Sequence, residues 1–132
     1  MTLIDTNILL DMVTEDPIWS DWSIRQLDMA SLKGPLLIND VIYAEMSVRF
    51  ERIESLDQML EKAGITLTAI PPPALFLASK VFQRYRAAGG IRSGVMPDFF
   101  IGAHASIVGI PLLTRDTKRY RTYFPAIDLI DP

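Results

Sequence analysis

Four carboxylates occupy positions from which a protein can bind a metal ion. Asp5 directly follows one short apolar run, and Asp116 follows another, at 112–114, by two residues. Asp98 opens one helical segment and Glu45 lies inside another. Open α/β sheets bind their ligands beyond the carboxyl ends of the strands, where Asp5 and Asp116 are expected. Since carboxylate oxygens are the ligands that Mg²⁺ and Mn²⁺ prefer, metal chemistry is the first hypothesis.

Glu45 is the most informative of the four acids. Its neighbours three and four residues away on a helix are Val41, Ile42, Val48 and Arg49, so it is expected in a core-facing stripe. An unpaired buried carboxylate is energetically expensive. Either Arg49 pairs with Glu45, or a bound cation neutralises it together with the other acids.

The other three acids also have common structural roles. Asp98 suits the first turn of a helix, where the helix dipole favours a negative charge. Asp5 can cap the helix that follows it, and Asp116 can belong to a turn. Four such acids in one chain nevertheless favour a shared site.

Composition excludes several other kinds of site. The 132 residues are 49% hydrophobic and 22% charged, which is typical of one folded domain. The absence of cysteine excludes disulfides, Cys-ligated zinc and a thiol nucleophile. One histidine, His104, is too few for a His-rich metal site and disfavours a Ser-His-Asp triad. It is expected on the flank of its helix.

Short apolar runs alternate with longer helical patterns along the chain. This alternation predicts an α/β fold with a central, mainly parallel β-sheet and helices on both faces. Strands are expected at 3–4, 36–38, 65–70, 112–114 and 128–130, and helices at 6–13, 21–32, 40–50, 51–63, 74–88 and 97–108. The glycine-bearing stretch 87–94 is too short to separate domains, so residues 1–132 are expected to form a single domain.

The chain is expected to be cytoplasmic. No uncharged apolar segment reaches the roughly 18 residues of a membrane span, and the N-terminus lacks the basic region of a signal peptide. Charge is unevenly distributed, with a net of −7 over residues 1–79 and +4 over residues 80–132. The basic part suggests a local anionic partner, although scattered surface charge explains the same count.

The ordered set of acids resembles the PIN-domain family. The segment Leu3-Ile4-Asp5-Thr6-Asn7 is similar to the opening of PIN domains, in which Asp-Thr-Asn ends the first strand. The family's second, third and fourth acids correspond to Glu45 in 41–45, Asp98 in 98–105 and Asp116 in 113–116. Size and single-domain form resemble the VapC-type toxins of toxin–antitoxin pairs. The bulky pair Phe99-Phe100 departs from the family's smaller residues and affects packing or substrate access.

This resemblance implies a metal-dependent endoribonuclease that hydrolyses phosphodiester bonds of RNA with Mg²⁺ or Mn²⁺. Three carboxylates are expected to bind the metal directly: Asp5, Glu45 and Asp98. The fourth, Asp116, is expected to act through a second metal or a water. Asn7 and Thr114 are expected to orient these carboxylates. Such a site activates a water for in-line attack and stabilises the leaving oxygen.

RNA binding requires cations around the acids, because phosphate contacts dominate affinity. The candidates flank two of the proposed ligands: Arg92, Arg115, Lys118, Arg119 and Arg121. Tyr120 and Tyr123 are candidates for stacking on bases, and core packing is the alternative for at least one of them.

The resemblance also implies protein partners, namely a cognate antitoxin and a second copy in a homodimer. Trp19 and Trp22 lie three residues apart among polar residues, so they form either a partner surface or core anchors.

Three other functions are alternatives for this sequence. A haloacid-dehalogenase-like phosphatase needs a second aspartate two residues after the first, where this chain has Asn7. A signalling receiver needs an acceptor Asp at a strand end, whereas Asp57 lies in a helical acidic run. The remaining alternative is a degenerate PIN domain that only binds RNA or protein.

Overall fold

The structure is a computed structural model that describes residues 1–91 and 94–132. Five strands form one sheet: β1 (Thr2–Ile4), β2 (Leu36–Ile38), β3 (Ile65–Leu67), β4 (Leu112–Leu113) and β5 (Leu129–Ile130). The helices are α1 (Thr6–Val13), α2 (Ser20–Lys33), α3 (Asp40–Ser47), α4 (Ile53–Lys62), α5 (Pro72–Ala87), α6 (Met96–Val108) and α7 (Lys118–Tyr123). None of the helices within the described ranges is both long and apolar enough to cross a membrane.

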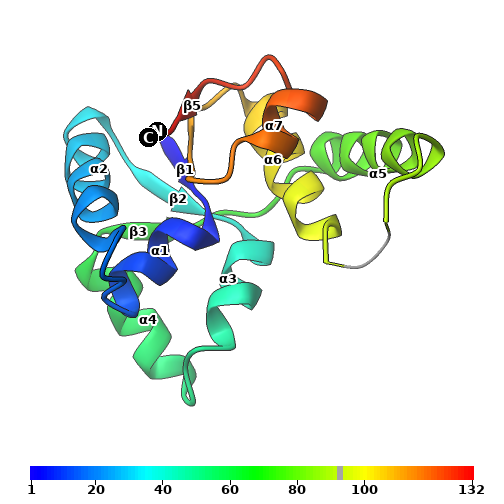
Figure 1. Cartoon of the computed structure of the whole chain (residues 1–132). Helices are drawn as coiled ribbons and strands as arrows, with labels where there is room; N and C mark the ends of the chain where they lie inside the picture. Colours follow the sequence, from blue (N-terminus) through cyan, green and yellow to red (C-terminus); the bar gives the residue numbers. More distant parts are fainter. Residues whose placement is uncertain (92–93) are drawn as a thin grey trace.

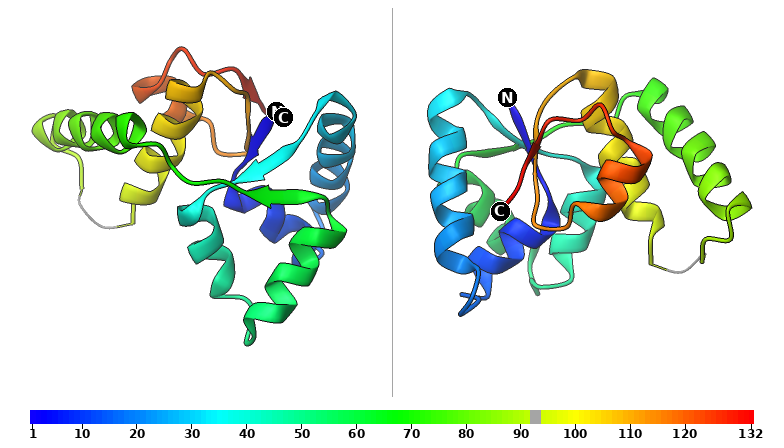
Figure 2. Two further views of the ribbon diagram at one scale, coloured as in Figure 1. Left: turned by 180° about the vertical axis from the view of Figure 1, so that it is seen from behind. Right: turned by 45° about the horizontal axis from the view of Figure 1, so that its top comes forward.

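The sheet has the order β3-β2-β1-β4-β5, and every neighbouring pair is parallel. The α/β fold class predicted from the sequence is therefore confirmed. The chain builds outward from β1 to β3 and then crosses back to β4, so the direction of winding reverses between β1 and β4. Helices lie on both sides of the sheet, with α2 on one and α6 on the other (Figures 1 and 2). The point of reversal is where such sheets bind ligands.

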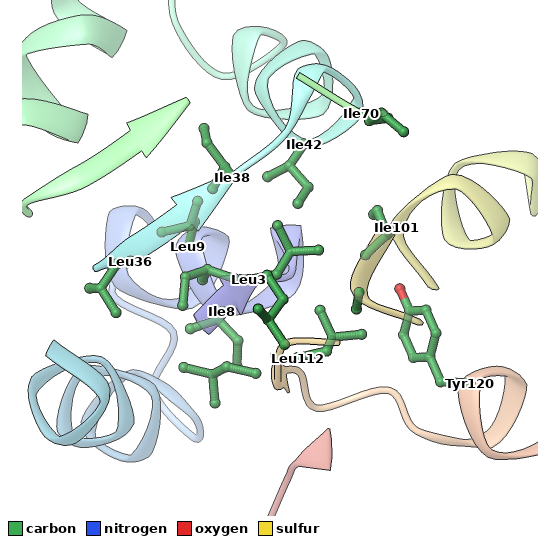
Figure 3. Packing of buried hydrophobic residues seen from close by; sticks show 14 of the residues in the cluster. Leu3, Ile8, Leu9, Leu36, Ile38, Ile42, Ile70, Ile101, Leu112 and Tyr120 are labelled. Carbon is green, nitrogen blue, oxygen red and sulfur yellow. The ribbon is translucent and has the colours of Figure 1, made fainter. Parts of the chain in front are cut away.

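The strands consist of apolar residues because both faces of the sheet are covered. Leu3 and Ile4 point to opposite faces, and both are fully buried. Leu3 and Leu112 lie at the centre of the packing, with Tyr120 at its edge beside α6 (Figure 3).

Polar residues at the strand ends begin the helices that follow. The Asp5 side chain accepts a hydrogen bond from the backbone N–H of Thr6 at the start of α1. The Asn39 side chain accepts from the N–H groups of Val41 and Ile42 at the start of α3. Polar side chains at the carboxyl edge of the sheet are therefore held in place by capping the helices that follow.

Several boundaries differ from those expected. Helix α7 was not predicted, because six residues span too few turns to establish a periodicity. Strand β3 stops at Leu67 rather than at residue 70, and α5 begins at Pro72, as suits proline in a first turn. The interval 48–52 separates α3 from α4, so the predicted helix end at residue 50 was too late.

Gly102 allows the segment after α7 to lie close to α6. A Cβ atom at this position would lie 2.5 Å from the ring of Phe124. The small residue therefore seats the segment that follows α7 against α6.

Candidate functional site

The adjacency of β1 and β4 creates the centre of the site. Ile4 pairs with Leu113 in the parallel register, so the next residues, Asp5 and Thr114, leave the sheet side by side. The Thr114 hydroxyl donates a hydrogen bond to Asp5 Oδ2 over 2.8 Å. Two residues that are 109 positions apart in the chain thus meet at the carboxyl edge.

Asp5 is the most buried acid of the site, with an exposed fraction of 4%. Its Oδ1 accepts from the Thr6 backbone N–H over 2.8 Å. Its Oδ2 accepts from Thr114 Oγ1, from the Tyr120 hydroxyl over 2.9 Å and from Asn7 Nδ2 over 3.3 Å. These donors fix the orientation of the carboxyl group.

Burial raises the pKa of Asp5 from 3.8 to about 6, because a charged carboxylate is poorly solvated there. The hydrogen bonds from Thr114 and Tyr120 act in the opposite direction, and the negative charge of Asp98 adds to the rise. Burial beside Asp5 raises the pKa of Tyr120 well above its ordinary value of 10, so this hydroxyl remains a donor.

Asn7 and Thr114 also hold the loop that carries Asp116. The Asn7 amide donates to Thr114 Oγ1 over 3.2 Å and accepts from the Arg115 backbone N–H over 3.1 Å. The Asp116 backbone N–H donates to Thr114 Oγ1 over 3.1 Å. Asn7 and Thr114, both proposed to orient the carboxylates, thus connect β1, α1 and the loop after β4.

Asp98 lies in the first turn of α6 and forms an ion pair with Arg119 of α7. Burial raises the pKa of Asp98, and Arg119 opposes that rise. The negative charges of Asp116 and Glu45 raise it further. Asp98 in turn raises the pKa of Asp5, so each of the four predicted acids is linked by its charge to at least one of the others.

Glu45 is half-buried, and its Oε1 accepts a hydrogen bond from Thr6 Oγ1 over 2.6 Å. Of the two alternatives for Glu45, the pairing with Arg49 is absent from the ion pairs found in the described part of the chain. The expected apolar stripe is also incomplete, because α3 ends at Ser47 and leaves Val48 84% exposed.

The donor set suits a hard divalent cation, although the side chains are held by other groups. Carboxylate oxygens are the donors that Mg²⁺ and Mn²⁺ prefer. Burial, with a smaller contribution from neighbouring acids, raises the pKa of Asp5 and of Asp98, and a bound cation would stabilise their charged forms. Across residues 1–91 and 94–132, no three His, Cys, Asp or Glu side chains form a group that could hold a metal ion. Arg119 supplies the positive charge at Asp98 instead.

The proposed RNA-binding cations lie in different environments. Lys118 and Arg119 line a cavity of about 340 Å³ beside Asp116. Arg121 is largely exposed and pairs with Asp131. Arg92 falls outside the described residues.

The Arg115 side chain is half-buried and pairs with an acid of α1. Its guanidinium binds both oxygens of Asp11, over 2.6 and 2.8 Å, and lies 5.0 Å from the centre of the Trp19 ring. Asp11 is buried and also accepts from Ser23. Because the backbone of Arg115 is bonded to Asn7, this ion pair anchors the loop of Asp116 to α1.

The two tryptophans are half-buried and contact each other edge to face, with 6.0 Å between ring centres. Trp22 packs against the hydrophobic core, whereas Trp19 covers Arg115. His104 is buried rather than exposed on the flank of its helix. Its Nδ1 forms a 3.1 Å hydrogen bond with the amide of Asn39, the residue that caps α3.

Sequence reasoning missed the contact of Tyr120 with Asp5. Tyr120 was considered for base stacking, but its side chain is only 1% exposed. The available signal was the spacing of Tyr120 and Phe124, four residues apart, which marks one buried face of a short helix.

The open parallel sheet, with Asp5 at the end of β1 and Asp116 in the loop after β4, defines an α/β protein with polar groups at its carboxyl edge. Residues 2–125 match the sequence model of the PIN domain, and the chain belongs to the PIN domain family. The resemblance inferred from the ordered acids is thereby confirmed. No curated protein is significantly similar to the chain in sequence.

Solved structures share this fold at low sequence identity. VapBC2 from Rickettsia felis bound to a promoter DNA fragment has a TM-score of 0.76 and 18% identity, covering 99% of this chain and 98% of that chain. DNA-bound VapBC from Salmonella typhimurium has a TM-score of 0.71 and 16% identity, with 98% and 96% covered. A toxin–antitoxin complex from Klebsiella pneumoniae has a TM-score of 0.66 and 20% identity, with 98% and 96% covered.

Proposed function

We propose that this PIN domain is a divalent-metal-dependent endoribonuclease and the toxin of a type II toxin–antitoxin pair. The observation that carries the proposal is the meeting of Asp5 and Thr114 where the sheet reverses its winding, with Asp98 near enough for its charge to raise the pKa of Asp5. The structural similarity to VapBC and other toxin–antitoxin complexes supports the toxin assignment.

The chemistry follows from the donor set. Asp5, Glu45 and Asp98 would hold Mg²⁺ or Mn²⁺, with Asp116 acting through a second ion or a water. When bound, the ion supplies the charge that activates a water for in-line attack and stabilises the leaving oxygen. Burial and the donors on Asp5 Oδ2 keep this carboxyl group in one orientation.

The proposed partners are an RNA substrate, a cognate antitoxin and a second copy of the chain in a homodimer. We propose the cytoplasm as the place of action, where both RNA and antitoxin are present.

An RNA-cleavage assay tests the enzymatic part. The wild-type protein and the control Asp28→Asn, which changes an exposed acid of α2, should cleave an RNA panel in Mn²⁺ and stop in EDTA. Asp98→Asn should bind RNA without cleaving it. Cleavage that persists in EDTA, or in Asp98→Asn, would contradict the metal site. RNA binding without cleavage in any metal would instead identify the non-catalytic alternative.

A further inference from the structure

We propose that the cavity between α5 and α7 is a binding site for one nucleotide of the RNA strand, next to the bond that is cleaved. The inference rests on the nuclease function proposed above and adds a subsite to it. The cavity has a volume of about 340 Å³ and is lined by Tyr85, Asp116, Lys118, Arg119, Thr122 and Tyr123. This volume is at the lower end for small-molecule sites, as suits one nucleotide. Helices α5, α6 and α7 lie together on one side of the molecule (Figures 1 and 2).

Aromatic rings form one part of the cavity. Tyr85 and Tyr123 are half-buried, with their ring centres 5.7 Å apart. Phe99 of α6 contacts both rings, at 5.2 and 5.5 Å between centres, and is fully buried. The two tyrosines are therefore held in place by the core. Fixed aromatic rings bind bases without sequence preference, because every base has a π face.

Cationic and hydroxyl groups form the other part. Lys118 and Thr122 lie four residues apart on α7, as do Arg119 and Tyr123, so two rows of one helix line the cavity. Lys118 is exposed and makes no ion pair within the described part of the chain. An ammonium group at this position is suited to a phosphate of the RNA backbone.

The cavity is continuous with the acidic group. Asp116 and Arg119 both line it, and the guanidinium of Arg119 forms an ion pair with Asp98. A base stacked on Tyr123, with a phosphate at Lys118, would therefore bring the neighbouring phosphodiester towards Asp116, one of the proposed metal ligands.

A larger cavity elsewhere lacks these features. It has a volume of about 580 Å³ and lies beside α4 and β3. Asp57 and Glu61 are among its lining residues, but no lysine or arginine is. Its negative charge would repel a phosphate, so it is not a nucleotide site.

Metal-free binding separates this subsite from catalysis. The probe is a short fluorescein-labelled single-stranded RNA, followed by fluorescence anisotropy in EDTA. Tyr123→Leu should weaken binding about 5-fold to 150-fold, as expected for loss of one stacked base. Tyr123→Phe keeps the ring and should bind like the wild type. Lys118→Ala should lower the slope of log affinity against log salt by about one.

Lys62→Ala is the matched control, because Lys62 is an exposed lysine of α4 outside this cavity. Uridine 5′-monophosphate should compete with the RNA, and ribose 5-phosphate should compete more weakly. Equal competition by the two compounds would overturn base stacking. Lys118 is exposed, so its variant remains informative if Tyr123→Leu fails to fold.

The subsite is overturned if Lys118→Ala binds RNA with the affinity and salt slope of the wild type. It is also overturned if the wild-type protein binds no RNA in the absence of metal. The outcome for the nuclease proposal is separate. Cleavage by the wild type in Mn²⁺ with no effect of the Tyr123 and Lys118 substitutions would refute the subsite alone. If both variants lose RNA binding and the wild type cleaves no RNA in any metal, the nuclease proposal alone is refuted.

Discussion

Tyr120→Phe is the sharpest test of how the surrounding fold sets the pKa of Asp5. The substitution keeps the buried ring and removes only the hydroxyl that donates to Asp5 Oδ2 over 2.9 Å. A hydrogen bond to a charged group contributes about 1.5–3 kcal/mol, and one pKa unit corresponds to about 1.4 kcal/mol. The pKa of Asp5, about 6 in the wild type, should therefore rise by roughly 1–2 units in the variant.

The sign of the effect on stability follows from the two states of the chain. The pKa of Asp5 is higher in the folded protein than its ordinary value of 3.8, so the folded state binds the proton more tightly. The stability that this gives is complete below pH 3.8 and is lost as the pH rises through about 6. In Tyr120→Phe the loss should continue to roughly pH 7–8.

Urea unfolding in EDTA, measured from pH 5 to pH 8.5, checks this reasoning. The free energy of unfolding of the variant should fall below that of the wild type by about 1.5–3 kcal/mol at pH 8.5 and by less at pH 5. Tyr123→Phe is the matched control, because Tyr123 makes no hydrogen bond to Asp5 among the contacts of the described residues. An equal difference at both pH values would refute control of Asp5 by Tyr120.

Three further changes test other contacts. Arg119→Gln removes the cation at Asp98, so Mn²⁺ should raise the melting temperature at lower concentrations than in the wild type, and an unchanged midpoint would exclude competition. Burial lowers the pKa of His104 from 6.5, so the free energy of unfolding should decrease as the pH falls below 6.5 and protonation favours the unfolded chain. The NMR titration of His104 in the folded protein should have its midpoint below 6.5. A midpoint at or above 6.5 would contradict this. Gly102→Ala would press a methyl group against the Phe124 ring. Urea unfolding should show a loss of about 1–3 kcal/mol in the free energy of unfolding. A change under about 0.5 kcal/mol would mean that the Phe124 ring moves aside without cost.

The sequence alone determined the fold class, the family and the approximate positions of the strands. Short apolar runs mark buried parallel strands because both faces of such a sheet are covered, and their ends mark the edge where ligands bind. Asp5 and Asp116 could be placed at that edge for this reason. The match to the PIN domain over residues 2–125 confirms the family, and the all-parallel sheet confirms the fold class. The roles of the individual acids remain predictions that the assays above test.

Tertiary structure decided which group contacts each acid. Tyr120 reaches Asp5 across 115 positions, and Arg119 reaches Asp98 across 21, only because β4 lies beside β1 and α7 packs near α6. Arg115 illustrates the limit of reading charge from sequence, since it looks like its basic neighbours but binds Asp11 inside the protein. Local periodicity records which face of an element is apolar. It does not record which distant donor meets a given side chain, because that depends on strand order and on the packing of segments as short as α7.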